Sequence, residues 1–266
     1  MEGVGGQESA ELRITNWGKA MAIGWNGSHY FTDSGTLRSS AAVTHTAPSV
    51  SDGLLLVCVH ARDNAATTIS SVKRGSTDLT KISGASIRNE YSSGLYHYVE
   101  WWYEIAPPSG SVTINVSYSE AMSSDAVEVF YLSGVHQGSP VGASGTNTGS
   151  GTTLSVGLTT GTAQSWVLAG GTQRRASGGS YTAGTDDVRM GEGQTGTATN
   201  SDITFVSLYT AAGAAGVYTV SGVNDTSSSQ WTMGAVEIKE LTLSGHAHRK
   251  VGQRAPLMSK VGGVLA

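Results

Sequence analysis

The sequence contains few of the features that build helices, disulfides or membrane spans. Charged residues make up 14% of the 266 residues, and no segment carries apolar residues at helical spacing for more than two turns. Cys58 is the only cysteine, which excludes an intramolecular disulfide and indicates a reducing compartment. The longest aliphatic run, Leu54 to Val59, is too short to cross a membrane, and the N-terminal residues lack the regions of a signal peptide. We therefore expect neither a membrane span nor a secretion signal.

The remaining composition is typical of a turn-rich antiparallel β-protein. Glycine accounts for 36 residues, and hydrophobic residues, 38% of the chain, occur in short runs with period-two alternation. The sequence therefore predicts an all-β fold, an antiparallel β-sandwich of jelly-roll type with extended N- and C-terminal arms. The predicted strands lie near residues 20–25, 28–32, 36–46, 53–61, 68–74, 78–83, 94–105, 111–118, 124–132, 152–158, 164–172, 187–190, 203–210, 215–220 and 231–239.

Three regions follow from the pattern. Residues 1–35 are predicted to form an N-terminal arm and the first strands, residues 36–240 the sandwich body, and residues 241–266 a C-terminal arm. The Gly/Ser/Thr stretch 134–151 has the composition of an interdomain linker. We favour a long connection within one sandwich, because residues 152–240 contain few large apolar residues for a second core.

Two segments resemble each other faintly. Residues 41–61 and 152–172 both read as a strand, a short turn and a buried strand. We interpret them as two uses of one hairpin plan within the sandwich rather than as a sequence repeat.

The charge is distributed unevenly. Residues 1–240 hold 12 basic and 20 acidic residues, a balance of −8, whereas residues 241–266 hold 4 basic and no acidic residues, a balance of +4. An acidic body argues against nucleic-acid binding by the sandwich, because that binding depends on neutralising phosphates. The basic arm is the region whose charge suits an acidic protein partner.

The stretch "VEWWYEIAPPSGSVTINVSY", which begins at Val99, carries the aromatic and acidic residues expected of a sugar site. Neighbouring side chains on a strand point to opposite faces, so Trp101 packs in the core while Glu100, Trp102 and Glu104 face the other way. The two prolines end the strand and a hairpin returns. Trp102 is then an exposed indole that can stack on a glycan or a protein partner, unless a neighbouring sheet covers it.

Paired carboxylates are a weaker feature of this stretch. Glu100 and Glu104 lie four residues apart, which separates their Cα atoms by roughly 13 Å on a strand. Catalytic carboxylates of glycosidases lie about 5 to 9.5 Å apart, so these two do not form a catalytic pair. Glu128, on a neighbouring predicted strand, is the residue that could approach either one.

Other motifs that carry chemistry are missing. "GEGQTG", residues 191–196, matches the dinucleotide-binding pattern G-x-G-x-x-G, but a Thr-rich segment and a strand follow it in place of a helix, so we interpret it as a glycine loop. The seven histidines are scattered, and no nucleophile elbow, phosphate-binding loop or zinc pattern occurs. We expect a protein that is not an enzyme and has no cofactor or metal.

Several segments together resemble a β-sandwich domain that recurs in structural proteins of tailed bacteriophages. The segments are "DGLLLVCVHARDN" (52–64), "SSVKRGSTDLTKIS" (70–83), "WWYEIAPPSGSVTINVSYS" (101–119), "AVEVFYLSGVHQGSP" (126–140) and "WTMGAVEIKE" (231–240). The resemblance covers residues 36–240 and implies a virion component similar to capsid decoration, or cement, proteins. It implies no catalytic residues, and the basic arm has no counterpart in the pattern.

These observations lead to one expected function and one alternative. The expected function is a homo-oligomeric decoration protein of a virion, made in the host cytoplasm, that binds the major capsid protein or another virion protein. Its contact residues lie in the C-terminal arm: Arg249, Lys250, Arg254, Leu257, Met258 and Lys260. The alternative is a carbohydrate-binding or receptor-binding module of a tail appendage, with Trp102 as the stacking residue.

Overall fold

The computed structural model describes residues 22–25, 29–174, 180–196, 202–225 and 228–242. The chain forms an all-β fold of packed antiparallel sheets, as the composition predicted. The one helical element among the described residues is a 3-10 turn, η1 (Ser83–Ala85). In the same part of the chain no helix has the length and hydropathy needed to span a membrane.

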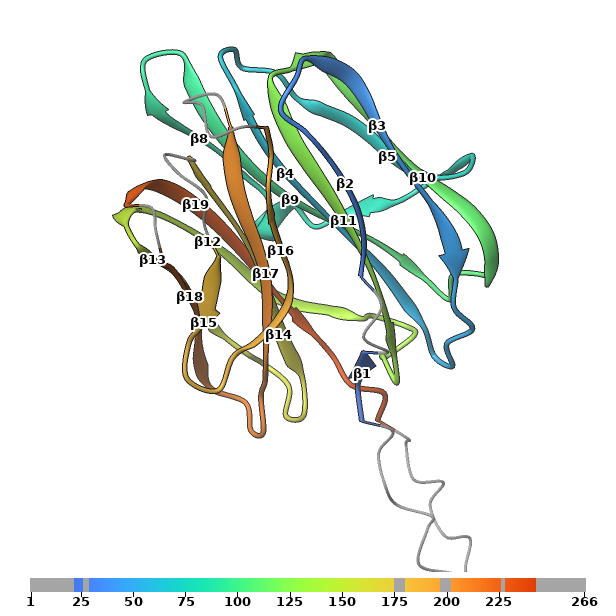
Figure 1. The fold of residues 1–266 in the computed structure, drawn as a ribbon. Coiled ribbons are helices and arrows are strands. Elements are labelled where there is room, and N and C mark those ends of the chain that lie inside the picture. The colour runs from blue at the N-terminus through green and yellow to red at the C-terminus, as the bar shows by residue number, and fades with distance from the viewer. Residues whose placement is uncertain (1–21, 26–28, 175–179, 197–201, 226–227, 243–266) are drawn as a thin grey trace, which may run out of the picture.

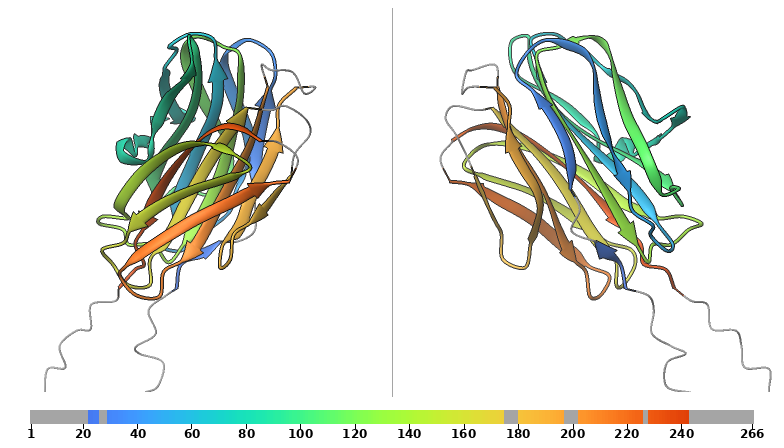
Figure 2. Two further views of the ribbon diagram at one scale, coloured as in Figure 1. Left: turned by 90° about the vertical axis from the view of Figure 1, so that its left-hand side faces the viewer. Right: turned by 45° about the vertical axis from the view of Figure 1, so that its right-hand side comes forward.

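Four sheets lie in layers, and the first two come from residues 24–133 (Figures 1 and 2). We call this part the first unit. Its inner sheet has the order β2-β11-β4-β9-β8, with β1 also paired to β11 and β7 to β9, and its outer sheet has the order β3-β10-β5-β6. The strands are β1 (Gly24–Trp25), β2 (Tyr30–Ser34), β3 (Arg38–Ala47), β4 (Leu54–Asp63), β5 (Ile69–Arg74), β6 (Thr77–Asp78), β7 (Thr80–Lys81), β8 (Ile87–Ser92), β9 (Leu95–Ile105), β10 (Gly110–Met122) and β11 (Ser124–Ser133).

The other two layers come from residues 141–238, which we call the second unit. Its inner sheet has the order β12-β19-β14-β17-β16, and its outer sheet has the order β13-β18-β15. The strands are β12 (Val141–Gly151), β13 (Thr153–Thr159), β14 (Trp166–Arg174), β15 (Tyr181–Ala183), β16 (Val188–Gln194), β17 (Ile203–Ala211), β18 (Val217–Asn224) and β19 (Ser229–Ile238).

The two units have the same strand order. The strands β2, β3, β4, β5, β8, β9, β10 and β11 correspond in that order to β12 to β19, and with this correspondence both units have the same sheet orders. The short strands β1, β6 and β7 of the first unit have no counterpart among the described residues of the second. Each unit thus places eight main strands in two sheets, an arrangement of the jelly-roll type. The segments 41–61 and 152–172 are the equivalent pairs β3–β4 and β13–β14, so their faint resemblance marks a repeated unit rather than a reused hairpin.

The body differs from the single sandwich that we expected over residues 36–240. The stretch 134–151 is not simply a long connection, because β12 occupies most of it and pairs with β19 through backbone hydrogen bonds that need no large side chains. The second unit also buries a core of its own, built from residues that include Leu154, Val156 and Leu208. The glycine loop expected at 191–196 belongs largely to the edge strand β16.

Three hydrophobic cores alternate with the four sheets, so both inner sheets are buried on both faces. On β4, Leu55 and Val57 pack toward the outer sheet of the first unit, while Leu54 and Leu56 pack toward the second unit. All ten residues of β4 are buried. This explains why the strand reads as a continuous apolar run rather than an alternating one.

The two inner sheets pack face to face with an approximate internal two-fold relation. A connection of six residues precedes both β4 and its equivalent strand β14, so their first residues, Leu54 and Trp166, are equivalent positions. Counting four residues along each strand makes Cys58 equivalent to Gly170. These two equivalent residues meet: a Cβ on Gly170 would lie 2.6 Å from Cys58 Sγ. The strands β4 and β14 therefore cross near the axis that relates the units.

Hydrogen bonds across this interface follow the same relation. Strand registers make Trp101 equivalent to Ser207, and Glu128 equivalent to Gly234. Trp101 Nε1 donates to the Gly234 carbonyl oxygen at 3.1 Å, and Ser207 Oγ donates to Glu128 Oε2 at 2.5 Å. Large side chains of the first unit thus fill the space left by small residues of the second.

This packing predicts that Gly234→Ala is destabilising. A Cβ at residue 234 would overlap the backbone carbonyl of Ala85, which cannot rotate away as a side chain could. We expect a loss of about 1–3 kcal/mol in the free energy of unfolding, measured by urea titration. Gly157→Ala on β13, where the nearest heavy atom is 4.0 Å away, is the matched control and should stay within about 0.5 kcal/mol of the parent. Equal effects at both positions would contradict the proposed packing.

Candidate functional site

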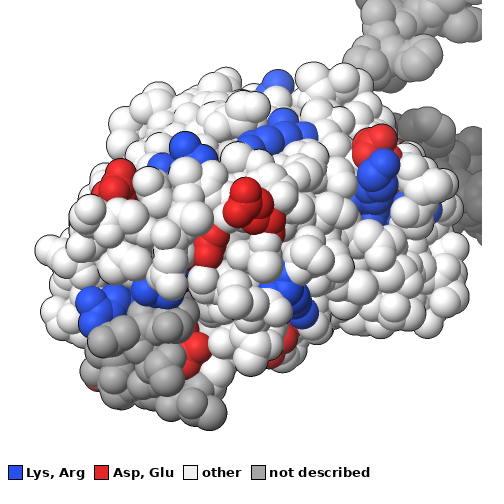
Figure 3. Space-filling view, turned by 90° about the horizontal axis from the view of Figure 1, so that it is seen from above, with Lys and Arg blue, Asp and Glu red and all other residues white. Residues whose placement is uncertain are grey.

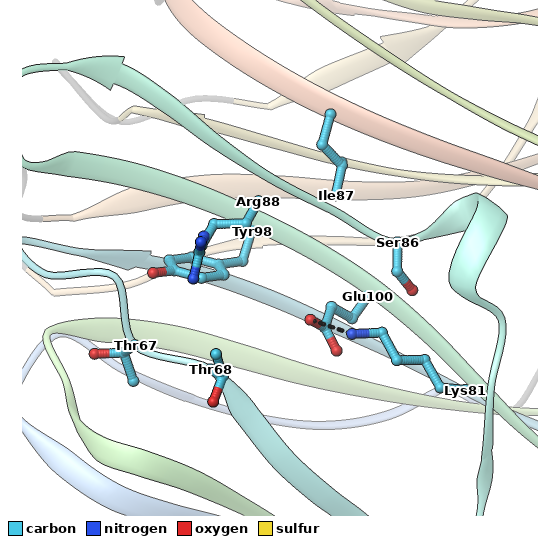
Figure 4. A pocket seen from close by; sticks show the side chains of 8 residues that line it. All are labelled: Thr67, Thr68, Lys81, Ser86, Ile87, Arg88, Tyr98 and Glu100. Carbon is cyan, nitrogen blue, oxygen red and sulfur yellow. Dashed lines mark ion pairs between the residues drawn. The ribbon is translucent and has the colours of Figure 1, made fainter.

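A polar pocket of about 300 Å³ opens beside β9 in the first unit (Figure 4). It lies between the inner sheet, which contributes β7, β8 and β9, and the segment that leads into β5. The lining residues are Thr67, Thr68, Lys81, Ser86, Ile87, Arg88, Tyr98 and Glu100.

Strand pairing brings the charged groups of this pocket together. Glu100 comes from the middle of β9, Lys81 from β7 and Arg88 from β8, and both of these strands pair with β9. Lys81 Nζ lies 2.7 Å from Glu100 Oε1, the ion pair drawn in Figure 4. The same ammonium lies 5.7 Å from the centre of the Trp102 ring, a cation–π distance.

The carboxyl group of Glu100 is the buried functional group of the pocket. The residue is 7% exposed, and among the described residues its Oε2 atom has no partner in good hydrogen-bonding geometry. Burial raises the pKa of Glu100 above its usual range, although Lys81 opposes this shift. The pocket thus combines one unsatisfied acceptor with donors on Lys81 and Arg88, which suits a small polar ligand that bears hydroxyl or carboxylate groups.

Trp102 lies in a core rather than on an exposed face. The side chain is 8% exposed and belongs to the cluster between the inner and outer sheets of the first unit. Strand parity was predicted correctly, since Trp101 packs toward the second unit. The error was to regard the opposite face as polar, because the outer sheet covers it. Of the two interpretations of Trp102 that the sequence left open, the structure shows the covered indole and not the exposed stacking platform.

The three glutamates considered for sugar chemistry are not brought together. Glu104 makes a bidentate ion pair with Arg74, with distances of 2.7 and 2.8 Å, and Glu100 pairs with Lys81. Glu128 lies on β11, which β4 separates from β9, and it faces the second unit, whereas Glu100 and Glu104 face the other side of the sheet. The approach of Glu128 to either residue, which the sequence left open, does not occur.

The contact residues predicted for the C-terminal arm lie outside the described part of the chain. They are Arg249, Lys250, Arg254, Leu257, Met258 and Lys260. The structure therefore leaves their proposed role as a prediction.

A second polar group is buried where the two units meet. Glu128 is completely buried and lies 2.7 Å from His60 Nε2 and 2.8 Å from His29 Nε2. Cys58 belongs to the same group, since its Sγ and the ligand atoms of His60 and Glu128 all lie within 4.8 Å of one another. We call His29, Cys58, His60 and Glu128 the interface cluster.

The electrostatics of the interface cluster favour an ionised carboxylate beside a neutral thiol. Burial opposes ionisation of Glu128, but its contacts with His29 and His60 outweigh burial and lower the pKa of the carboxyl to about 2. Burial raises the pKa of the Cys58 thiol well above its usual range, and Glu128 adds to this shift. Cys58 is fully buried, so in this arrangement it is not placed to act as a surface nucleophile.

Sequence reasoning missed both groups of residues. The pocket cations Lys81 and Arg88 lie on a two-residue strand and on a strand that was not predicted, so nothing in their spacing linked them to Glu100. The interface cluster had one local signal. Cys58 and His60 are two residues apart on one strand and must share a face.

The comparisons with known proteins give no relative. No family model matches the chain, and neither a curated protein nor a solved structure matches it. Function must therefore be argued from the residues and their geometry.

The pocket predicts a pH-dependent effect of Glu100→Gln. Because the folded state raises the pKa of Glu100, the unfolded chain loses this proton first, and stability falls as the pH rises through the unfolded value of about 4.3. The variant lacks this titration. We therefore expect Glu100→Gln to gain stability relative to the parent between about pH 4 and neutral pH, measured by urea unfolding across that range.

Glu120→Gln, which removes an exposed carboxylate, is the control and should show a smaller pH-dependent difference. A Glu100→Gln difference that is constant with pH, or that reverses sign, would contradict the assignment.

Proposed function

We propose that the protein is a non-enzymatic structural protein of a virion, most similar in role to a capsid decoration protein. The observation that carries this proposal is that the chain enters and leaves the body at the same place. A body attached by both ends at one point presents the rest of its surface outward, as a decoration protein does.

Strand pairing places the first and the last segment of the body beside each other. Gly24 pairs with Ser133 at the end of β11, and two residues later Val135 forms a bridge with Glu240. Residues 22–25 and 239–242 therefore lie together at one end of the body (Figures 1 and 2). Segments that precede and follow the body can then contact the same partner.

Charge supports a protein partner at that end. The sequence after residue 240 carries a balance of +4, against −8 for the rest of the chain. On the face shown in Figure 3, acidic and basic side chains are few and interspersed, without a field of one sign. We assign the attachment to the arm residues Arg249, Lys250, Arg254 and Lys260 with carboxylates of the major capsid protein, and to Leu257 and Met258 with apolar surface there.

Repetition would strengthen such an attachment. A homo-oligomer of this chain would offer several arms to a repeating lattice, and linked weak contacts gain through their effective concentration. The resemblance of residues 36–240 to sandwich domains of tailed-phage structural proteins supports the virion as the site of action.

Deleting residues 243–266 tests this function. The deletion leaves the described body intact, so we expect an unchanged urea midpoint but loss of binding to capsids assembled without the protein, measured by co-sedimentation. A second variant keeps the length and removes the charge, with alanine at Arg249, Lys250, Arg254 and Lys260. We expect it to bind at least tenfold more weakly and with less salt dependence. Full occupancy by the truncated protein would rule out attachment by the arm.

The pocket beside Glu100 supports a second candidate, a carbohydrate-binding or receptor-binding tail module. Its buried acceptor and two cations suit an acidic or hydroxyl-rich sugar, although Trp102 is not available as an exposed platform. We expect a glycan array to show binding by the parent chain and a loss of at least tenfold in Arg88→Ala. Lys73→Ala, at an exposed ion pair on the outer sheet, is the control. An array that is blank for the parent would remove this candidate.

A further inference from the structure

The interface cluster gathers four metal-binding side chains at the contact between the two units. His29 precedes β2, Cys58 and His60 lie on β4, and Glu128 lies on β11. We propose that this cluster binds one divalent transition-metal ion of the zinc class, with Cys58 Sγ, His60 Nε2 and the Glu128 carboxylate as ligands and His29 paired with the second carboxylate oxygen. The proposal is independent of the function proposed above.

The donor set and its spacing suit such an ion. Zinc in proteins takes thiolate, imidazole and carboxylate ligands at about 2.0 to 2.3 Å, which places the ligand atoms about 3.3 to 3.7 Å apart in a tetrahedron. In the interface cluster the imidazole–carboxylate distances are 2.7 and 2.8 Å, and the atoms of Cys58, His60 and Glu128 lie within 4.8 Å of one another. Ion binding would therefore replace the short imidazole–carboxylate contacts by longer distances across the ion.

The contact between His29 and Glu128 is close without being a hydrogen bond. His29 Nε2 and Glu128 Oε1 are 2.8 Å apart, yet within the described part of the chain neither atom has a partner in hydrogen-bonding geometry. The carboxylate is completely buried, so an oxygen that accepts no well-aligned hydrogen bond is costly there, even beside His29. A cation bound to the carboxylate would offset that cost.

The hydrogen bonds of His60 orient its ring as in a metal ligand. Thr172 Oγ1 donates its single proton to the Tyr98 carbonyl oxygen at 3.0 Å, so it accepts from His60 Nδ1 at 3.1 Å. Nδ1 is thereby engaged by Thr172, and Nε2 points at Glu128 Oε2 at 2.7 Å, so Nε2 is the nitrogen that would exchange its proton for a metal ion. Metal-binding histidines are held in the same way, with the second nitrogen donating to a neighbouring oxygen. Ser207 Oγ likewise donates to Glu128 Oε2 and fixes the carboxylate.

Glycines of the second unit allow the side chains of the cluster to lie directly against its backbone. A Cβ on Gly170 would lie 2.6 Å from Cys58 Sγ, and a Cβ on Gly191 would lie 2.7 Å from His29 Nε2 and would overlap Glu128 Oε1. Cys58, His60 and Glu128 are completely buried, whereas the His29 side chain is 18% exposed. The approach for an ion is therefore past His29, and the bound ion would join β4 to β11 at the unit interface.

Metal analysis of the full chain tests the proposal. We expect protein purified without chelator to hold about one zinc per chain, measured by mass spectrometry, and dialysis against a chelator to lower the unfolding midpoint. Co²⁺ added to the metal-free protein should give the near-ultraviolet absorption of a cobalt–thiolate bond. Cys58→Ser should abolish that band, and His29→Gln, which removes the partner of the second Glu128 oxygen, should weaken Co²⁺ binding at least tenfold while the chain stays folded.

Two controls separate this site from other histidines. His97→Gln changes a buried histidine outside the cluster and should leave Co²⁺ affinity and the absorption band unchanged. Changing both His246 and His248 to alanine removes the H-x-H sequence of the C-terminal segment and should also leave them unchanged. A folded parent chain that binds neither Zn²⁺ nor Co²⁺ would overturn the proposal. Binding that is lost in the His246/His248 variant but kept in Cys58→Ser would do so as well.

Discussion

The fold depends on the contact between the two inner sheets. Each unit alone would expose the apolar face of its inner sheet, which carries Leu54, Leu56 and Trp101 in the first unit and Leu168 and Val236 in the second. An exposed sheet face of this kind is an association surface. The two units cover these faces with each other, so one chain contains the contact that a two-fold dimer of sandwiches would make.

Close approach of the two inner sheets requires complementary side chains near the axis. Two identical copies of β4 would place cysteine against cysteine and leave no space for Trp101. In the second unit glycine stands at the positions equivalent to Cys58 and Glu128, namely Gly170 and Gly234. The units are therefore alike in topology and unlike in sequence where they touch. The same asymmetry buries polar groups of one unit against the backbone and hydroxyl groups of the other.

The sequence was sufficient for the fold class but not for the arrangement of the sheets. Period-two alternation identified most strands, and parity assigned Trp101 and Trp102 to opposite faces correctly. It could not show that both faces of β9 are covered, because Glu100 and Glu104 gave the second face a polar pattern that ion pairs with Lys81 and Arg74 satisfy. The strand β12 was missed because its Gly/Ser/Thr sequence pairs through the backbone alone.

The same reasoning explains why the interface cluster is invisible in sequence. Its four members are spread over residues 29 to 128, and a zinc pattern is recognised from closely spaced ligands on one loop. Here the sheet order β2-β11-β4 brings these side chains together, and register sets Glu128 directly opposite Cys58. Only the C-x-H spacing on β4 is local. Ligands held by sheet register are as well oriented as ligands on a loop, because neighbouring strands fix each backbone position through continuous hydrogen bonds.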